Sequence, residues 1–223
     1  MTELLAARAR RVVAIEIDPE LVEKLREKLG GDHRIEVLPA NILATDIAAL
    51  CRQHQVAQCF VFGNLPYYIT SPILHHLFSF VSSVRGMALL VQREVAQRLT
   101  AQPGSRDYGY LSVLAQFHSR PRMMLGIPPG AFSPPPKVQS ALVDFRMIPA
   151  FPEGTPFPPH EFLEFVKRCF AQKRKTLLNN LEAEHSRPRV EGALAGLGLP
   201  RSARAEQLSL HELAKLFEHL GGT

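Results

Sequence analysis

Short apolar runs rich in β-branched residues alternate with segments of helical periodicity along the first two thirds of the chain. The runs are RVVAIEID, RIEVL, CFVFG and GMALLVQ. Each is brief and nearly continuous in apolar character, which is typical of a strand buried on both faces. Strands that alternate with helices predict an α/β fold with a doubly wound, mostly parallel sheet. We expect two later runs, PRMMLGI and VQSALVDFRM, to form an antiparallel edge of that sheet.

Helix signals fall between these runs. Asp18 is a predicted cap and Pro19 the first residue of the helix PELVEKLREKLGG, which two glycines end. Further helices are predicted in ILATDIAALCRQ, in PILHHLFSFV from Pro72, from Glu94 onwards, and in YGYLSVLAQFHS. Sheets of this kind bind ligands beyond the carboxyl ends of their strands.

The chain is predicted to have two domains. The α/β pattern fills residues 1–148, and the proline-rich residues 149–160 are typical of a stiff linker. Residues 161–223 have helical character throughout, in EFLEFVKRCFAQKRKTLLNNLEAE, RVEGALAGLG and SLHELAKLFEHL. The last segment starts with a capping box formed by Ser209 and Glu212.

Composition excludes several classes of protein. The three cysteines show no C-x-x-C spacing and the nine histidines are scattered, so we predict neither a disulfide framework nor a metal site. No apolar run has the length of a membrane span, and the N-terminus lacks the pattern of a secretory signal. We therefore expect a cytoplasmic monomer without a membrane partner. The net charge of +5 permits a polyanionic partner but does not demand one.

Two polar residues follow the first two predicted strands. Glu16 ends the first strand, where a carboxylate often accepts hydrogen bonds from both hydroxyls of a ribose; a solvated carboxylate is an equally good interpretation. Asn41 follows the second strand, where its side-chain carbonyl would accept from an adenine amine. A turn or helix-entry asparagine is the commoner role for such a residue.

The stretch FVFGNLPYYITSPIL places Asn64, Leu65, Pro66 and Tyr67 where a buried strand ends. The exocyclic nitrogen of adenine is a poor nucleophile because its lone pair is delocalised into the ring. The Asn64 side-chain carbonyl and the Leu65 main-chain carbonyl would each accept one amine hydrogen and free that lone pair. Pro66 would fix the backbone, and Tyr67 would offer a ring on which a base stacks. An ordinary strand-to-helix turn is the alternative.

The loop GAFSPPPKVQSALV supplies a second aromatic ring. We expect this proline-stiffened loop to place Phe132 opposite Tyr67, with a base swung out of its stack between them. Lys137 would then lie near the phosphates. A hydrophobic plug is the alternative role for the loop.

Basic residues cluster near the predicted ends of helices, at Arg93, Arg98, Lys173, Arg174 and Lys175. Basic residues at such positions commonly solvate a surface or complement a helix dipole. For QKRK, nucleic-acid contact and plain solvation are equally good interpretations, since three adjacent charges cannot all lie on one helical face.

The motifs AIEIDPEL, FGNLPYYI, QREVAQRL, YGYLSVLAQF, FSPPPKVQSALV and CFAQKRKTLLNNL, in this order, resemble the ribosomal-RNA adenine dimethyltransferase family. The resemblance implies a Rossmann-like methyltransferase core, S-adenosylmethionine as methyl donor, and dimethylation of two adjacent adenosines near the 3′ end of small-subunit rRNA during ribosome biogenesis. Antibiotic-resistance enzymes that methylate large-subunit rRNA share this core. The last two motifs are more similar to the small-subunit branch.

The resemblance also implies roles for individual residues. Glu16 would bind the cofactor ribose and Asn41 its adenine. The full cofactor set is Glu16, Ile17, Asn41, Ile42 and Asn64. The target base would meet Asn64, Leu65, Pro66 and Tyr67, and the substrate contacts would be Tyr67, Phe132, Arg93, Lys137, Lys173 and Arg174.

Two departures from the family pattern bear on activity. The family has Asp where this sequence has Asn41, so cofactor binding would lose charge assistance. The family also has an arm, a strand at the centre of the sheet and a Gly-rich loop before the helix that Thr2 continues, and we expect all three to be missing. The chain would then be an inactive shortened enzyme or a non-catalytic rRNA-binding assembly factor. A related methyltransferase acting on DNA or on protein amide nitrogen is a third interpretation.

Overall fold

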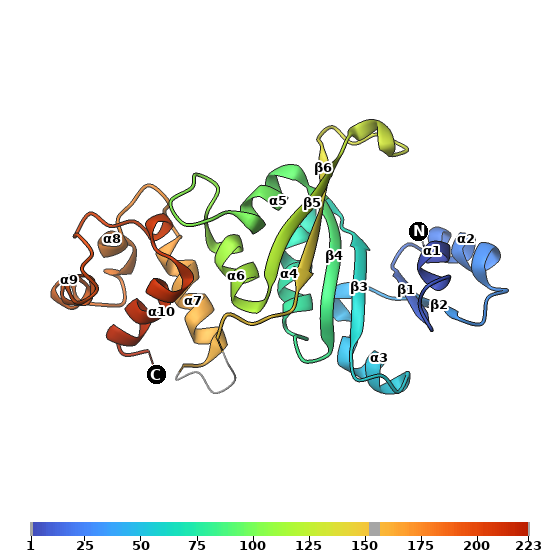
Figure 1. Ribbon diagram of the computed structural model, residues 1–223, viewed down its shortest axis with the longest axis horizontal. Coiled ribbons are helices and arrows are strands. Elements are labelled where there is room, and N and C mark those ends of the chain that lie inside the picture. Colours follow the sequence, from blue (N-terminus) through green and yellow to red (C-terminus); the bar gives the residue numbers. More distant parts are fainter. Residues whose placement is uncertain (1, 152–156, 223) are drawn as a thin grey trace. The chain divides into compact units, whose positions relative to one another are not determined.

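The structure is a computed structural model that describes residues 2–151 and 157–222 (Figure 1). Contacts divide the chain into two units, Met1–Ala57 with Ser71–Ser83, and Gln58–Thr70 with Val84–Thr223. The predicted linker at 149–160 includes residues 152–156, which lie outside the described residues. The division into domains at that linker therefore stays a prediction.

The first unit is built on one pair of parallel strands. Strands β1 (Val12–Glu16) and β2 (Ile35–Pro39) pair in parallel and are connected by α2 (Pro19–Leu29). The predicted cap of α2 is confirmed, because the Asp18 carboxylate accepts a hydrogen bond of 2.9 Å from the Glu20 amide. The unit also contains α1 (Thr2–Ala6) and most of α4 (Thr70–Phe78).

The single helix predicted over residues 42–53 is wrong. A 3-10 helix at Ile42–Ala44 is followed by a separate helix, α3 (Ile47–Gln53). The break lies at Asp46, whose backbone is extended and whose carboxylate accepts from the Ala49 amide at 2.8 Å. A new cap inside the apolar pattern thus starts a new helix.

The second unit contains a sheet of four strands in the order β3-β4-β6-β5. Their bounds are β3 (Cys59–Asn64), β4 (Val84–Gln92), β5 (Arg120–Ile127) and β6 (Ser140–Arg146). Strand β3 is parallel to β4, whereas β6 is antiparallel to both β4 and β5. The predicted antiparallel edge is therefore confirmed, and Figure 1 shows β5 and β6 running side by side.

The parallel pairs do not share one sheet. Among the described residues, β1 and β2 form one sheet, and neither β1 nor β3 has a strand partner on its second edge. The predicted α/β class with parallel strand pairs is confirmed, and among the described residues these pairs belong to two separate sheets.

Six α-helices are present among the described residues of the second unit. They are α5 (Arg93–Thr100), α6 (Tyr110–His118), α7 (Pro159–Cys169), α8 (Leu177–Leu181), α9 (Arg187–Gly196) and α10 (Leu210–His219). Helices α5 and α6 pack on β5, and α10 packs on α6, α7 and α9. Phe162, Phe165 and Leu213 are fully buried in one core that the C-terminal helices share with Val113 of α6.

The long helix predicted over residues 161–184 is also wrong, because α7 ends at Cys169 and α8 starts at Leu177. The side chain of Asn180 explains the break. Its amide donates to the Cys169 carbonyl at 2.7 Å and to the Gln172 carbonyl at 3.3 Å, which satisfies oxygens left over where α7 ends. The QKRK residues consequently lie in a turn, so the argument from helical faces does not apply to them.

The predicted capping box at the start of α10 is confirmed. The Glu212 amide donates to the Ser209 hydroxyl oxygen, while the Glu212 carboxylate accepts from the Ser209 amide at 2.8 Å and from its hydroxyl at 2.7 Å. These bonds from Ser209 lower the pKa of Glu212. The ionised box is therefore the form that stabilises the start of α10.

Replacing Ser209 by Ala is expected to lower the free energy of unfolding by about 1 kcal/mol near neutral pH, because the cap and its partner bonds are lost. A depressed pKa gives stability that is present above the unfolded-state pKa of Glu212 and is lost as the pH falls. The difference between Ser209→Ala and the unmodified chain should accordingly shrink in acid. Urea unfolding of the two proteins, once near neutral pH and once in acid, measures this difference in the free energy of unfolding.

Ser186→Ala is the matched control, since Ser186 precedes α9 without a side-chain capping bond. It should change the free energy of unfolding by less than about 0.5 kcal/mol. Equal losses for the two variants would contradict the role given to the capping box.

Candidate functional site

Two hydrogen-bond acceptors are left open where β3 ends. The pairing of β3 with β4 continues to Asn64 opposite Leu90, and the Leu65 amide then donates to the Leu90 carbonyl at 3.0 Å. The Asn64 side chain is exposed, and within the described residues neither it nor the Leu65 carbonyl oxygen has a hydrogen-bond partner. The bond between the Leu65 amide and the Leu90 carbonyl thus fixes the backbone that carries these two oxygens, neither of which has a partner.

Pro66 turns the chain immediately after these acceptors. Its backbone has φ −59° and ψ 127°, as expected for proline, and a 3-10 helix at Tyr67–Ile69 follows before α4 starts. The Thr70 hydroxyl donates to the Pro66 carbonyl at 3.2 Å. The helical hydrogen bonds therefore begin at the Pro66 carbonyl and leave the preceding carbonyl, that of Leu65, out of the helix.

Tyr67 is held by a residue that the sequence analysis missed. The Tyr67 hydroxyl and the Ser140 hydroxyl share a hydrogen bond of 2.6 Å, and Ser140 is fully buried as the first residue of β6. The two residues are 73 positions apart, so no local pattern marks them as partners. This bond ties the loop after β3 to the strand that follows the proline-rich loop.

Phe132 lies in that proline-rich loop and is half-buried. It follows a 3-10 helix at Pro129–Ala131 and precedes a cis peptide bond between Ser133 and Pro134. Among the described aromatic pairs there is none between Phe132 and Tyr67. Two rings that hold a base between them do not touch each other, so the sandwich stays a prediction. Lys137 is exposed on the same loop.

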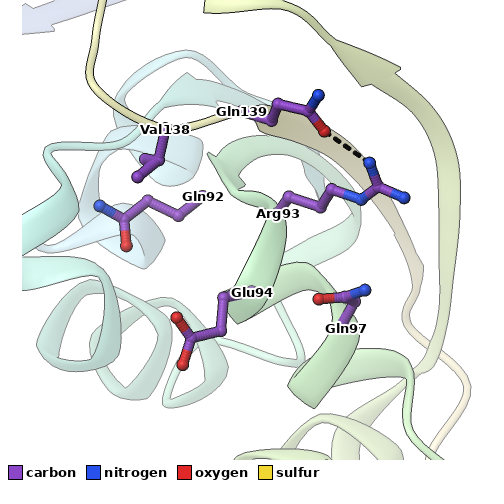
Figure 2. Close-up of a pocket in the computed structure, with 6 residues that line it drawn as sticks. All are labelled: Gln92, Arg93, Glu94, Gln97, Val138 and Gln139. Carbon is purple, nitrogen blue, oxygen red and sulfur yellow. Dashed lines mark hydrogen bonds between the residues drawn. The ribbon is translucent and has the colours of Figure 1, made fainter.

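Arg93 joins the start of α5 to the segment that enters β6. Its amide donates to the Gln139 carbonyl at 2.9 Å, and its guanidinium donates to the Gln139 side-chain oxygen. A cleft of about 280 Å³ opens beside this pair (Figure 2). We call it the glutamine cleft, and its lining residues are Gln92, Arg93, Glu94, Gln97, Val138 and Gln139. Arg98, also predicted to be basic surface, pairs with Glu94.

The basic residues of QKRK lie on the turn between α7 and α8. Lys173 donates to the Arg106 carbonyl in the loop before α6, while Arg174 and Lys175 are exposed. No described hydrogen bond or ion pair connects them to Asn64 or Tyr67. Arg93 is therefore bonded to the segment that follows Lys137, whereas the basic turn has no described bond to the residues at the end of β3.

The predicted cofactor residues of the first unit lie at the carboxyl ends of β1 and β2. One carboxylate oxygen of Glu16 accepts from the amides of Ile17 and Asp18 at 2.8 and 2.9 Å, and its other oxygen has no partner among the described residues. The Asn41 side-chain oxygen accepts from the Leu43 amide at 2.9 Å, which is the helix-entry role weighed as the alternative.

The two strand ends that carry these residues are also joined, because the Ala40 amide donates to the Glu16 carbonyl at 3.0 Å. Glu16 and Asn41 are thereby brought to one end of the pair. Of their neighbours, Ile17 is 65% exposed and Ile42 is half-buried, so both present apolar surface at this end.

Burial shifts the pKa values of several side chains in the helical core, whereas the side-chain hydrogen bond from Arg34 lowers the pKa of Asp32, in the turn before β2, to about 2. Burial raises the pKa of Tyr110 to about 12, and it raises the pKa values of Tyr108 and Cys169 as well. Across residues 2–151 and 157–222 there is no group of three or more His, Cys, Asp or Glu side chains that would hold a metal ion. The same residues include no helix with the length and apolarity needed to cross a membrane.

Comparison with known proteins identifies the family. The profile of the family "Ribosomal RNA adenine dimethylase" matches residues 1–221. The chain belongs to the ribosomal RNA adenine dimethylase family. It is 46% identical over 221 residues to a protein of Acidobacterium capsulatum named "Ribosomal RNA small subunit methyltransferase A", covering 99% of this chain and 77% of that protein.

Solved structures of similar fold agree with the predicted architecture. The 23S rRNA methyltransferase ErmE is 29% identical, with a TM-score of 0.69 over 98% of this chain and 85% of that structure. A dimethyladenosine transferase from Plasmodium falciparum has a TM-score of 0.77 over 98% of this chain and 86% of that structure; at 23% identity it bears on the fold alone. The predicted Rossmann-like methyltransferase fold is confirmed for this dimethylase-family chain.

The Tyr67–Ser140 bond can be tested by a double-mutant cycle on stability. Tyr67→Phe and Ser140→Ala each delete the same hydrogen bond, so their effects on the free energy of unfolding should be non-additive by about 0.5 to 1.5 kcal/mol. Denaturant unfolding of the two single variants and the double variant measures this coupling.

Tyr68→Phe is the control partner for Ser140→Ala, because Tyr68 is 86% exposed. That pair should be additive. Additive effects of Tyr67→Phe and Ser140→Ala would show that the hydroxyls do not interact in solution.

Proposed function

We propose that this chain transfers methyl groups from S-adenosylmethionine to the N6 nitrogens of two adjacent adenosines near the 3′ end of small-subunit rRNA. The observation that carries the proposal is the pair of open acceptors at the end of β3, the Asn64 carboxamide oxygen and the Leu65 carbonyl oxygen. Membership of the dimethylase family supports the reaction class.

Two acceptors on adjacent residues suit an exocyclic amine. Each takes one N6 hydrogen, and the amine then rotates its lone pair out of conjugation with the ring. The pairing of the Leu65 amide with Leu90 holds both oxygens in place before the base arrives, so little reorganisation is needed. The N6 proton becomes acidic once the nitrogen carries positive charge, so the site needs no strong base.

Tyr67 is suited to hold the target base by stacking. Base stacking on an aromatic ring contributes roughly 1–3 kcal/mol in single-stranded nucleic-acid sites. The bond to Ser140 restricts where the Tyr67 ring lies, so the ring offers a fixed face instead of a mobile one. The target adenosine must leave its own stack to reach the amine acceptors, which is the general route for enzymes that modify bases.

The residues at the end of the β1–β2 pair fit the cofactor. The unpaired carboxylate oxygen of Glu16 is free to accept from ribose hydroxyls, because only the other oxygen is used by the chain. The Asn41 oxygen, which already caps a helix, has a second lone pair for an adenine amine. S-adenosylmethionine supplies an electrophilic methyl group when bound.

The proposal assigns the RNA to the small subunit. The relative at 46% identity is named for small-subunit methylation, whereas ErmE at 29% identity is named for 23S rRNA. The exposed Arg174 and Lys175 and the loop residue Lys137 are available to contact phosphates. A ribosomal substrate supports the proposal of a cytoplasmic location.

A methylation assay tests the function. The 223-residue chain is incubated with labelled S-adenosylmethionine and either unmethylated small ribosomal subunits or large-subunit RNA. Label in two adjacent adenosines of the small-subunit RNA is the expected result. Label in large-subunit RNA alone would assign the chain to the ErmE type of activity. RNA binding without transfer to either would identify a non-catalytic assembly factor and would overturn the proposal.

Asn64→Ala is expected to slow methyl transfer by about 10²- to 10³-fold, the usual cost of removing one positioned group that stabilises developing charge. The affinity for RNA should remain within about twofold, because Asn64 contributes to the reacting geometry and not to phosphate contacts. Single-turnover transfer and fluorescence anisotropy measure the two quantities separately.

Asn179→Ala is the matched control, since Asn179 is exposed on α8. It should transfer methyl groups at the unmodified rate. Near-normal transfer by Asn64→Ala would remove Asn64 from the reacting site.

A further inference from the structure

The glutamine cleft adjoins the candidate site, and Arg93 is the one lining residue to which a role has been assigned. Gln92, the last residue of β4, is in register with Ser140 of β6, and Ser140 in turn is hydrogen-bonded to Tyr67. Gln92 of the cleft is thus the cross-strand neighbour of the residue that holds the Tyr67 ring, on which the target base would stack. All of these residues belong to the second unit.

The polar groups of the cleft fall into two sets. Arg93 and Gln139 are bonded to each other and brace the two rims, and Glu94 is paired with Arg98. Within the described residues the carboxamides of Gln92 and Gln97 have no hydrogen-bond partner. In Figure 2, Arg93 extends towards Gln139, whereas Gln92 extends to the opposite side, next to Val138.

These groups indicate what kind of ligand the cleft would take. A carboxamide presents both a donor and an acceptor, which matches the edge of a nucleobase, whereas a phosphate needs donors only. The Glu94 carboxylate on the rim also opposes a bound anion. The volume of about 280 Å³ lies just below the usual range of ligand pockets, so a single base fits better than a larger group.

Single-stranded RNA is recognised by this kind of chemistry. Proteins splay its bases out of the stack and bind their edges with side-chain hydrogen bonds, and Gln pairs well with the N6 and N7 atoms of adenine. A substrate with two adjacent adenosines places a second adenine beside the one in the site.

We propose that the glutamine cleft binds the base of the nucleotide next to the methylated adenosine, through hydrogen bonds from Gln92 and Gln97. This inference rests on the proposed function. It makes these two side chains specificity-determining residues that select adenosine at the neighbouring position. The two hydrogen bonds between Arg93 and Gln139 hold the start of α5 and the segment before β6 at a fixed separation, so the shape of the cleft is set before RNA arrives.

The test uses fluorescein-labelled RNA hairpins that carry the target adenosine and differ only at its neighbour, which is adenosine in one and an abasic site in the other. Anisotropy titrations give the affinity of each hairpin. The unmodified chain should bind the hairpin with the neighbouring adenosine about tenfold more tightly. In Gln97→Ala, which changes an exposed helix residue, and in the Gln92→Ala/Gln97→Ala double variant, this preference should fall towards equal binding.

Gln53→Ala is the matched control, because Gln53 is exposed at the last position of α3 and outside the cleft. It should keep the tenfold preference. Retained affinity of the Gln97→Ala variant for the abasic hairpin shows that the variant is folded and still binds RNA.

The remaining outcomes separate this inference from the proposed function. If the unmodified chain binds both hairpins equally and still methylates RNA, the cleft does not hold the neighbouring base and only the inference fails. If Gln97→Ala and the double variant keep the preference for the hairpin with the neighbouring adenosine, the inference likewise fails and the proposed function stands. If the chain binds neither hairpin, the proposed function fails and the inference fails with it.

Discussion

The hydrogen bonding of β4 on both edges is the constraint on which the rest of the site depends. This strand is buried along most of its length, so its backbone amides and carbonyls need partners inside the protein. Strand β3 supplies them in parallel on one edge and β6 in antiparallel on the other. The pairing brings three segments that are distant in the sequence, namely the ends of β3 and β4 and the start of β6, to one end of the sheet.

The chemistry proposed for the site follows from where that pairing stops. The last bond from β3 to β4 is made by the Leu65 amide, and Pro66 then turns the chain before a further strand bond can form. Two oxygens are therefore left open on a backbone that is fixed on the preceding side. Such a site acts through prior positioning of acceptors.

Local signals in the sequence, such as helix caps, predicted the structure correctly. Apolar periodicity read over long segments predicted helices that are too long. The cap at Asp18, the capping box at Ser209 and the antiparallel edge of β5 and β6 were all predicted and are present. The helices predicted over residues 42–53 and 161–184 are each interrupted. The first contains a new cap at Asp46, and the second is broken where the Asn180 side chain satisfies carbonyls at the end of α7. Apolar periodicity alone does not register such side-chain bonds to the backbone.

The sequence by itself determined the alternation of strands and helices, the position of Asn64 to Tyr67 at a strand end, and the family resemblance. These features depend on neighbouring residues, whose spacing is visible in the chain. Only the tertiary structure decided that the parallel strands form two sheets, that Ser140 holds Tyr67, and that Gln139 meets Arg93 at the glutamine cleft. Those contacts join residues 73 and 46 positions apart, and strand pairing at that separation leaves no local pattern from which to predict it.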